Sequence, residues 1–137
     1  RQIASDIGTQ KLKQANDEYT GLKETQVLTH DVTGASQTKT LDYSAGQTQK
    51  LTFSTSNGVT MSLSSWPSLE SGSMTLIVKV NAGITVGAVD WTAFGFKNTG
   101  PDFTGITADA DTTGLGYGIY EILFVGGEHY IFVVEEA

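Results

Sequence analysis

One group of residues in the sequence has the spacing of a metal site. Asp109, Asp111 and Thr113 precede Gly114 as oxygen ligands do in the first half of a calcium-binding loop, where a glycine takes the sixth position. The pattern then fails, because Tyr120 occupies position twelve, which needs a glutamate. We therefore expect an Asp- and Gly-rich turn here, with Asp109 and Asp111 as the metal-ligand candidates.

Residues for nucleophilic or acid–base catalysis are few. The chain has no cysteine and two histidines, His30 and His129, and no Gly-x-Ser-x-Gly motif accompanies them. Glycoside hydrolysis needs two carboxylates facing each other across a groove, and no spacing in the chain fixes such a pair. The carboxylates near the long loop are Asp90, Asp102, Asp109, Asp111 and Glu121. We expect no enzyme and no cofactor, and a capsule-degrading enzyme is the least favoured alternative.

Aromatic residues gather between positions 90 and 118, a segment without strand periodicity. Exposed rings there could stack on sugars or anchor a protein receptor, with Asn and Asp side chains adding hydrogen bonds. Large rings are mostly hidden in folded domains, so we expect most of these to be buried. The candidate receptor-binding residues are Trp91, Phe94, Phe96, Asn98, Asp102, Phe103 and Tyr117.

The composition limits the number of domains and the kinds of partner that the chain can bind. The 137 residues suit one domain. A net charge of −7, with eight Lys and Arg residues spread along the chain, provides no basic patch for nucleic acid. No apolar run approaches the ~20 residues of a membrane span, so we expect no membrane insertion.

Residues 1–25 differ from the rest of the chain. They hold four of the eight cationic residues and a thin, interrupted apolar stripe that begins with Ile3 and Ile7. Such a stripe cannot bury itself alone. We expect residues 1–25 to form an N-terminal arm or short helix for attachment or trimerisation, and residues 26–137 to form a β-domain.

Apolar and hydroxyl residues alternate in much of the β-domain, as in strands with one wet face. Residues 51–54 and 59–64 flank Ser56-Asn57-Gly58 and predict a hairpin. The predicted fold is all-β, an antiparallel β-sandwich or jelly-roll-like domain of about seven or eight strands. The predicted core is Leu41, Leu51, Phe53, Val59, Met61, Leu63, Leu76, Val78, Val80, Ile122, Phe124, Ile131 and Val133.

The closing segments, residues 119–125 and 130–134, are apolar almost throughout and are joined by a predicted turn of Gly126-Gly127-Glu128-His129. An antiparallel strand that is apolar on both sides is covered on both sides. The core of the domain covers one side, and another copy of the chain is the economical cover for the other, which predicts a homo-oligomer. The arm and these strands together favour a homotrimer. The candidate interface residues are Ile3, Ile7, Tyr120, Leu123, Val125, Tyr130, Phe132 and Val134.

Three elements of this order are characteristic: Thr40-Leu41-Asp42 before Ala45-Gly46, then Val59-Thr60-Met61-Ser62-Leu63, then the strands around Gly126-Gly127. Together they resemble the small β-domain of tail fibres, tail tips and other minor structural proteins of tailed bacteriophages. The resemblance spans roughly residues 38–134. Members often carry Trp-Pro after the middle strand, whereas Trp91 is followed by Thr92 in this chain.

The resemblance implies a virion component, assembled in the host cytoplasm and commonly trimeric. It would be a fibre, spike or tail-tip domain that joins other virion proteins through its arm and contacts a bacterial surface glycan or protein. The alternative within the same class is a head fibre or capsid-decorating protein without receptor binding.

Overall fold

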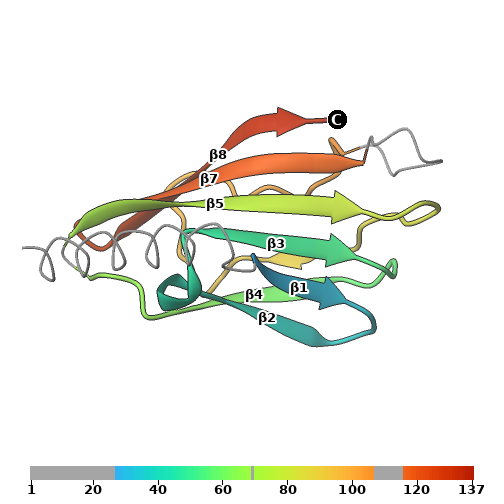
Figure 1. The fold of residues 1–137 in the computed structure, drawn as a ribbon, viewed down its shortest axis with the longest axis horizontal. Helices are drawn as coiled ribbons and strands as arrows, with labels where there is room; N and C mark the ends of the chain where they lie inside the picture. Colours follow the sequence, from blue (N-terminus) through green and yellow to red (C-terminus); the bar gives the residue numbers. More distant parts are fainter. Residues whose placement is uncertain (1–26, 69, 107–115) are drawn as a thin grey trace, which may run out of the picture.

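The computed structural model describes residues 27–68, 70–106 and 116–137 (Figure 1). These residues form eight strands and one turn of 3₁₀ helix in two sheets, which confirms the all-β prediction. The elements are β1 (Leu28–Val32), β2 (Gln37–Asp42), η1 (Tyr43–Ala45), β3 (Thr48–Phe53), β4 (Val59–Ser64), β5 (Ser71–Val80), β6 (Val89–Asp90), β7 (Tyr117–Val125) and β8 (Glu128–Glu136). The predicted arm and the metal-ligand candidates Asp109 and Asp111 lie outside the described residues.

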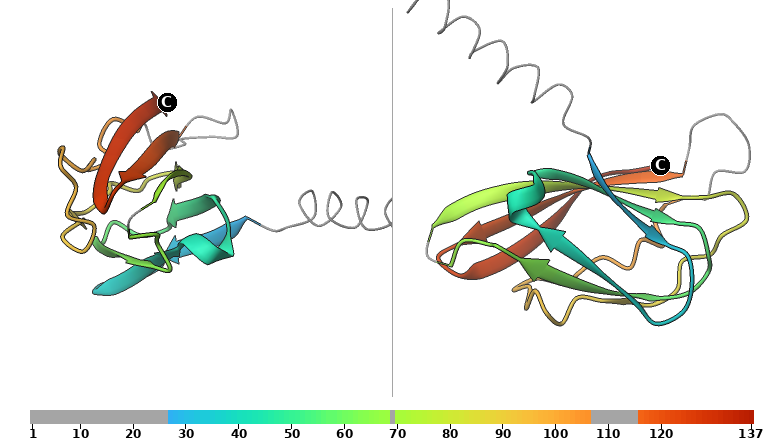
Figure 2. Two further views of the ribbon diagram at one scale, coloured as in Figure 1. Left: turned by 90° about the vertical axis from the view of Figure 1, so that its left-hand side faces the viewer. Right: turned by 60° about the horizontal axis from the view of Figure 1, so that its bottom comes forward.

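The strand order is β1-β3-β5-β7-β8 in the larger sheet and β2-β4-β6 in the smaller one. From β1 to β6 the chain changes sheet with every strand (Figures 1 and 2). After one strand in the other sheet the chain returns to the first sheet, and its next strand there pairs parallel with the previous strand of that sheet. The antiparallel prediction is wrong for the strand pairs among these six strands, and among the described strands it holds for the β5–β7 and β7–β8 pairs.

The predicted hairpin of residues 51–54 and 59–64 is also wrong, because β3 and β4 lie in different sheets. The backbone groups at the start of β4 are satisfied by the segment before β6 instead, where the amide of Val59 donates to the carbonyl of Ala88 at 2.9 Å. Ser56-Asn57-Gly58 therefore carries the chain from one sheet to the other. Period-two alternation identifies the buried side of a strand, and it does not identify the neighbouring strand.

The closing hairpin is confirmed, but its turn is shorter than predicted, because Glu128 and His129 already belong to β8. Strands β7 and β8 pair antiparallel, with Val125 opposite Glu128 across the turn. Gly126 and Gly127 have φ angles of 57° and 87°, the two positive values that a tight two-residue turn of this twist requires. Glycine adopts such angles without steric cost, so the Gly-Gly pair fixes the register of the last two strands.

Both sheets contribute to a single core. The predicted core residues are buried except Leu63, which is half-buried, and Val133, which is 56% exposed and was placed in the core wrongly. The core also takes in residues that the prediction omitted. These are Val32, Gln49, Met74, Phe94, Phe103, Ile106 and Tyr120.

The segment from Trp91 to Ile106 follows β6 and runs beside β8 (orange in Figure 2). The amide of Lys97 donates to the carbonyl of His129 at 2.8 Å, and the indole of Trp91 donates to the carbonyl of Pro101 at 2.8 Å. Phe94 and Phe103 project from this segment into the core. The segment thus closes the side of the domain next to β8.

Candidate functional site

The side of the larger sheet that faces away from the core, here called the outer face, is the main candidate site. Along β5 and β7 buried residues alternate with partly exposed ones, so every second side chain points to this face. Phe132 and Val125 are 49% and 48% exposed, so no described residue covers them fully. The apolar and aromatic residues of the outer face are Ile77, Tyr117, Ile119, Leu123, Val125, Tyr130 and Phe132.

Short-range contacts order the rings and carboxylates of the outer face. Tyr130 and Phe132 stack with ring centroids 6.5 Å apart and planes 9° from parallel. The hydroxyl of Tyr130 donates to Glu128 at 2.7 Å, and that hydrogen bond raises the pKa of the tyrosine. In the middle of the face, the hydroxyl of Thr75 donates to Glu121 at 2.9 Å. The face is therefore an ordered apolar surface with carboxylates among its rings.

Strand β8 lies at one edge of the larger sheet, and only the first half of its open side is covered by other residues. Lys97 and Asn98 bond to the backbone of His129 and Ile131. Beyond Ile131 the ladder shifts by one residue between Ile119 and Tyr120 of β7. The side chains that follow on β8 are exposed, with Val134 at 61%. An exposed apolar edge strand is a typical site for pairing with another chain.

The outer face brings together half of the predicted interface residues: Leu123, Val125, Tyr130 and Phe132 lie on it. Tyr120 does not. It is fully buried, its hydroxyl donates to Glu136 at 2.7 Å, and burial followed by that hydrogen bond raises its pKa. The even residues of β7 face the core, so the prediction for Tyr120 is wrong.

Other predicted interface residues lie elsewhere. Val134 is exposed beside the register shift of β8, and Ile3 and Ile7 lie outside the described residues. Sequence reasoning missed Ile77 and Ile119, which sit side by side at the centre of the outer face. The alternation of β5 already placed Ile77 opposite the core residues, and this was the signal that could have found it.

The aromatic segment does not form an exposed receptor surface. Phe94 and Phe103 are 2% and 0% exposed, so their placement among receptor-binding residues is wrong. Of the five rings of the segment, these two are buried and the other three are half-buried, so the expected burial of most rings holds in part. Trp91 and Phe96 are half-buried and pack against the core. Trp91 contacts Phe94, Phe96 and Phe103 with ring centroids 5.3 to 5.9 Å apart. These rings cover the hydrophobic core on this side of the domain.

The three polar receptor candidates are not brought together. Asn98 is engaged by the backbone of Ile131, and the hydroxyl of Tyr117 donates to Glu135 at 3.0 Å on the outer face. Asp102 is exposed and accepts hydrogen bonds from the amide and hydroxyl of Thr104, which lower its pKa. A receptor role for these residues stays a prediction.

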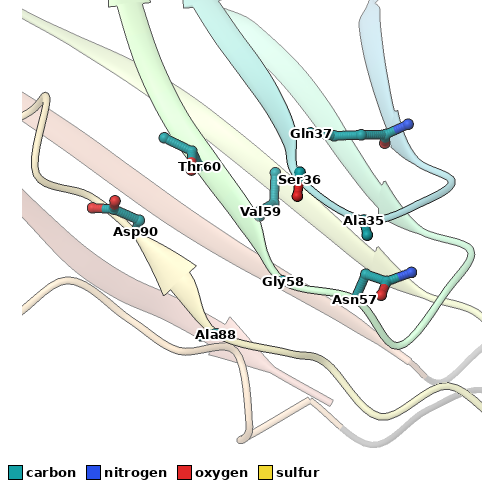
Figure 3. Close-up of a pocket in the computed structure, with 9 residues that line it drawn as sticks. All are labelled: Ala35, Ser36, Gln37, Asn57, Gly58, Val59, Thr60, Ala88 and Asp90. Atoms are coloured by element: carbon teal, nitrogen blue, oxygen red, sulfur yellow. The ribbon is translucent and has the colours of Figure 1, made fainter.

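A shallow hollow of about 280 Å³ lies where β2, β4 and β6 begin (Figure 3). Its lining residues are Ala35, Ser36, Gln37, Asn57, Gly58, Val59, Thr60, Ala88 and Asp90. Asp90 is the one carboxylate among them, and hydrogen bonds from the hydroxyl and amide of Thr92 lower its pKa. The hollow can offer hydrogen bonds to a small polar molecule, and it has no second carboxylate for acid–base chemistry.

The two histidines have structural surroundings. His30 bonds to the buried Gln49 side chain at 2.9 Å, and His129 packs edge-on against Trp66 at 5.7 Å. Among the described residues no group of three or more His, Cys, Asp or Glu side chains could hold a metal ion. In the described ranges, no helix has the length and apolar composition that crossing a membrane requires.

The chain matches no protein-family model, no curated protein and no solved structure.

Proposed function

We propose that this chain is a non-enzymatic structural domain of a tailed-bacteriophage virion, and that it assembles into a homotrimer through its outer face. The observation that carries the proposal is the group of apolar side chains on β5, β7 and β8 that are half-buried or, at Val125 and Phe132, exposed. Contiguous exposed apolar surface of this kind marks an interaction site. In this proposal the two sheets form a sandwich-like domain, and residues 1–25 join it to other virion proteins.

Within this class, the packing of the aromatic segment favours a structural role over adhesion. Rings that contact a receptor must be accessible, and Phe94 and Phe103 are not. A fibre module or a head-decorating protein needs only a stable fold and a self-association surface. Binding of a bacterial surface glycan or protein would then depend on exposed positions such as Asp102 or on another part of the virion.

The capsule-degrading alternative has less support. Glycoside hydrolysis needs two carboxylates roughly 5 to 10 Å apart across a groove. The described hollow offers Asp90 alone.

Light scattering of the full chain at several concentrations tests the proposal. We expect a trimer for the unchanged chain and monomers for Leu123→Glu and Phe132→Glu, because each puts a charge into the apolar contact. Thr60→Glu, on the exposed side of the smaller sheet, is the matched control and should stay trimeric. Circular dichroism confirms that each variant is folded.

A monomer at every concentration would overturn self-association through this face. If the unchanged chain is a dimer and both outer-face variants are monomers, the outer face is still the contact surface, and the three-fold arrangement is overturned. Equal masses for Thr60→Glu and the outer-face variants would overturn the assignment of the surface.

A further inference from the structure

The side of the smaller sheet that faces away from the core, here called the hydroxyl face, differs in chemistry from the outer face. Every second position on β2, β4 and β6 points to this side, and each of these positions carries a hydroxyl or a carboxylate. The residues are Thr38, Thr40, Asp42, Thr60, Ser62, Ser64 and Asp90. Because both sheets pack on one core, the hydroxyl face and the outer face lie on opposite sides of the domain (Figures 1 and 2).

The hollow of about 280 Å³ lies at one end of the hydroxyl face (Figure 3). Thr60 and Asp90 belong to both, since they pair in register on β4 and β6 and also line the hollow. The rest of the lining comes from the turn before β2, the start of β2, the chain around Gly58 and the start of β6. A solvated sheet face accounts for the hydroxyls, but it does not account for this concave surface beside them.

Part of the lining is apolar. Ala35, Val59 and Ala88 contribute methyl groups, and Gly58 contributes backbone without a side chain. Ligand sites commonly combine such an apolar surface with a few polar groups that fix the orientation of the ligand.

Four polar side chains of the lining have groups available for hydrogen bonds. Oδ1 of Asp90 accepts both bonds from Thr92, which leaves Oδ2 as an acceptor. Asn57 donates through Nδ2 to the hydroxyl two residues before it, which leaves its Oδ1 as an acceptor. The hydroxyls of Ser36 and Thr60 have no hydrogen bond to another described residue. The hollow therefore offers two acceptors and two hydroxyls.

We infer that the hollow binds one unit of a neutral glycan. Sugar hydroxyls both donate and accept hydrogen bonds, which matches acceptors placed beside hydroxyls, and sugar CH groups suit the methyl groups of the lining. An anionic ligand is disfavoured, because Asp90 is a carboxylate and no Lys or Arg is among the lining residues. The volume is at the lower end of the range for ligand sites and suits a single sugar ring.

The inference goes beyond the proposed assembly and does not depend on it. Contact between copies through the outer face leaves the hydroxyl face accessible on the other side of each copy. Three copies would present three hollows. A surface polysaccharide that reaches more than one of them would then bind more tightly than a free sugar.

The experiment titrates the full chain, by NMR, with methyl glycosides of glucose, galactose, mannose and N-acetylglucosamine, and with glucuronate as the anionic counterpart. We expect at least one neutral glycoside to bind and glucuronate not to bind. Tighter binding of a polymer of the bound sugar would identify a polysaccharide as the ligand, and equal binding would identify a free sugar.

A matched pair of variants tests the position of the site. Asp90→Asn keeps an acceptor for the bonds from Thr92 and changes the free carboxylate oxygen, so it should weaken binding at least about tenfold. Asp102→Asn is the control, because Asp102 accepts the same two bonds from Thr104 outside the hollow. It should bind the glycoside like the unchanged chain.

Two further variants separate this inference from the proposed function. Thr60→Glu puts a second carboxylate into the hollow, so it should remain trimeric and lose the glycoside. Leu123→Glu should be monomeric and bind the glycoside like the unchanged chain.

The glycan site is overturned if no neutral glycoside binds, if Asp90→Asn binds like Asp102→Asn, or if Thr60→Glu binds like the unchanged chain. None of these results affects the proposed assembly. An unchanged chain that is monomeric and still binds a neutral glycoside, with binding lost in Thr60→Glu, would overturn the assembly and support the glycan site.

Discussion

The side-chain amide of Asn98 binds both backbone groups of Ile131. Its Nδ2 donates to the carbonyl, and its Oδ1 accepts from the amide at 3.0 Å. Asn98 thereby takes the place that a further strand would occupy beside β8. Together with the bond from Lys97 to His129, it closes the first half of an edge that is otherwise open to other chains.

Replacement of Asn98 should therefore weaken both the fold and its solubility. We expect Asn98→Ala to lower the free energy of unfolding by about 1–3 kcal/mol, since it leaves two half-buried backbone groups without partners. Urea denaturation measures the loss, and turbidity on warming measures edge pairing. Thr99→Ala, at the exposed neighbouring position, should change neither. Equal stability of the two variants would contradict the role of the amide.

A close backbone approach between the chain before β4 and the chain before β6 predicts a second effect. A Cβ on Gly87 would lie 2.5 Å from the backbone nitrogen of Gly58, and a Cβ on Gly58 would lie 2.5 Å from the carbonyl oxygen of Ala88 (Gly58 and Ala88 are labelled in Figure 3). Backbone atoms cannot move aside cheaply, so Gly87→Ala should cost about 1–3 kcal/mol of stability.

Gly34→Ala is the matched control for this substitution. The nearest atom to its added Cβ would be Nε2 of Gln37 at 3.7 Å, an ordinary contact. Its unfolding free energy should stay within about 0.5 kcal/mol of the unchanged chain. If Gly87→Ala is as stable as Gly34→Ala, the chain before β4 and the chain before β6 do not approach each other as closely as described.

The positions of the strands and most of the core could be predicted from the sequence. Alternation of apolar and hydroxyl residues located β4 and β5, and Gly126-Gly127 located the final turn. The pairing of the strands could not be predicted, because a parallel strand with one wet face shows the same alternation as an antiparallel one. The turn residues Ser56-Asn57-Gly58 suit a hairpin, and here they serve a crossing between sheets.

The candidate site was predictable in part for a related reason. The doubly apolar character of β7 and β8 pointed to an uncovered face, and Leu123 and Phe132 lie on it. Successive residues of a strand point to opposite faces of the sheet, so an assignment that is wrong by one position moves a side chain to the other face. This is the error that put Tyr120 on the outer face. The burial of Phe103 depends on which side of the domain its segment closes, and no periodicity in the sequence encodes this.

Tyr120 provides a third prediction, which concerns its buried hydroxyl. Its ring lies 5.1 Å from that of Phe103, and its hydroxyl donates to Glu136. Tyr120→Phe keeps the ring and removes the bond, so we expect a loss of about 1 kcal/mol. Tyr120→Ala also opens a cavity and should cost about 3–5 kcal/mol.

Tyr130→Phe makes the same chemical change at the surface. Its hydroxyl bonds to Glu128 two residues away, in an exposed position, so no measurable loss is expected. Both variants are compared in the Leu123→Glu background, so that self-association does not contribute to the unfolding curves. A larger loss for Tyr130→Phe than for Tyr120→Phe would contradict the assigned burial.

The fourth prediction concerns acid. Asp42 and Asp90 each accept hydrogen bonds from the hydroxyl and amide of the residue two positions later, Ser44 and Thr92, and the hydroxyl bonds are the larger cause of their lowered pKa. A carboxyl whose pKa is lower in the folded state contributes stability above its unfolded pKa of about 3.9. That contribution is lost as the pH falls through the folded pKa. Asp90→Ala should therefore be less stable than the unchanged chain at pH 7 and pH 5, and the difference should shrink as the pH falls below the unfolded pKa of about 3.9. Urea midpoints across this range measure the difference, and a gap that persists undiminished at pH 2 would show that the charge of Asp90 does not stabilise the turn.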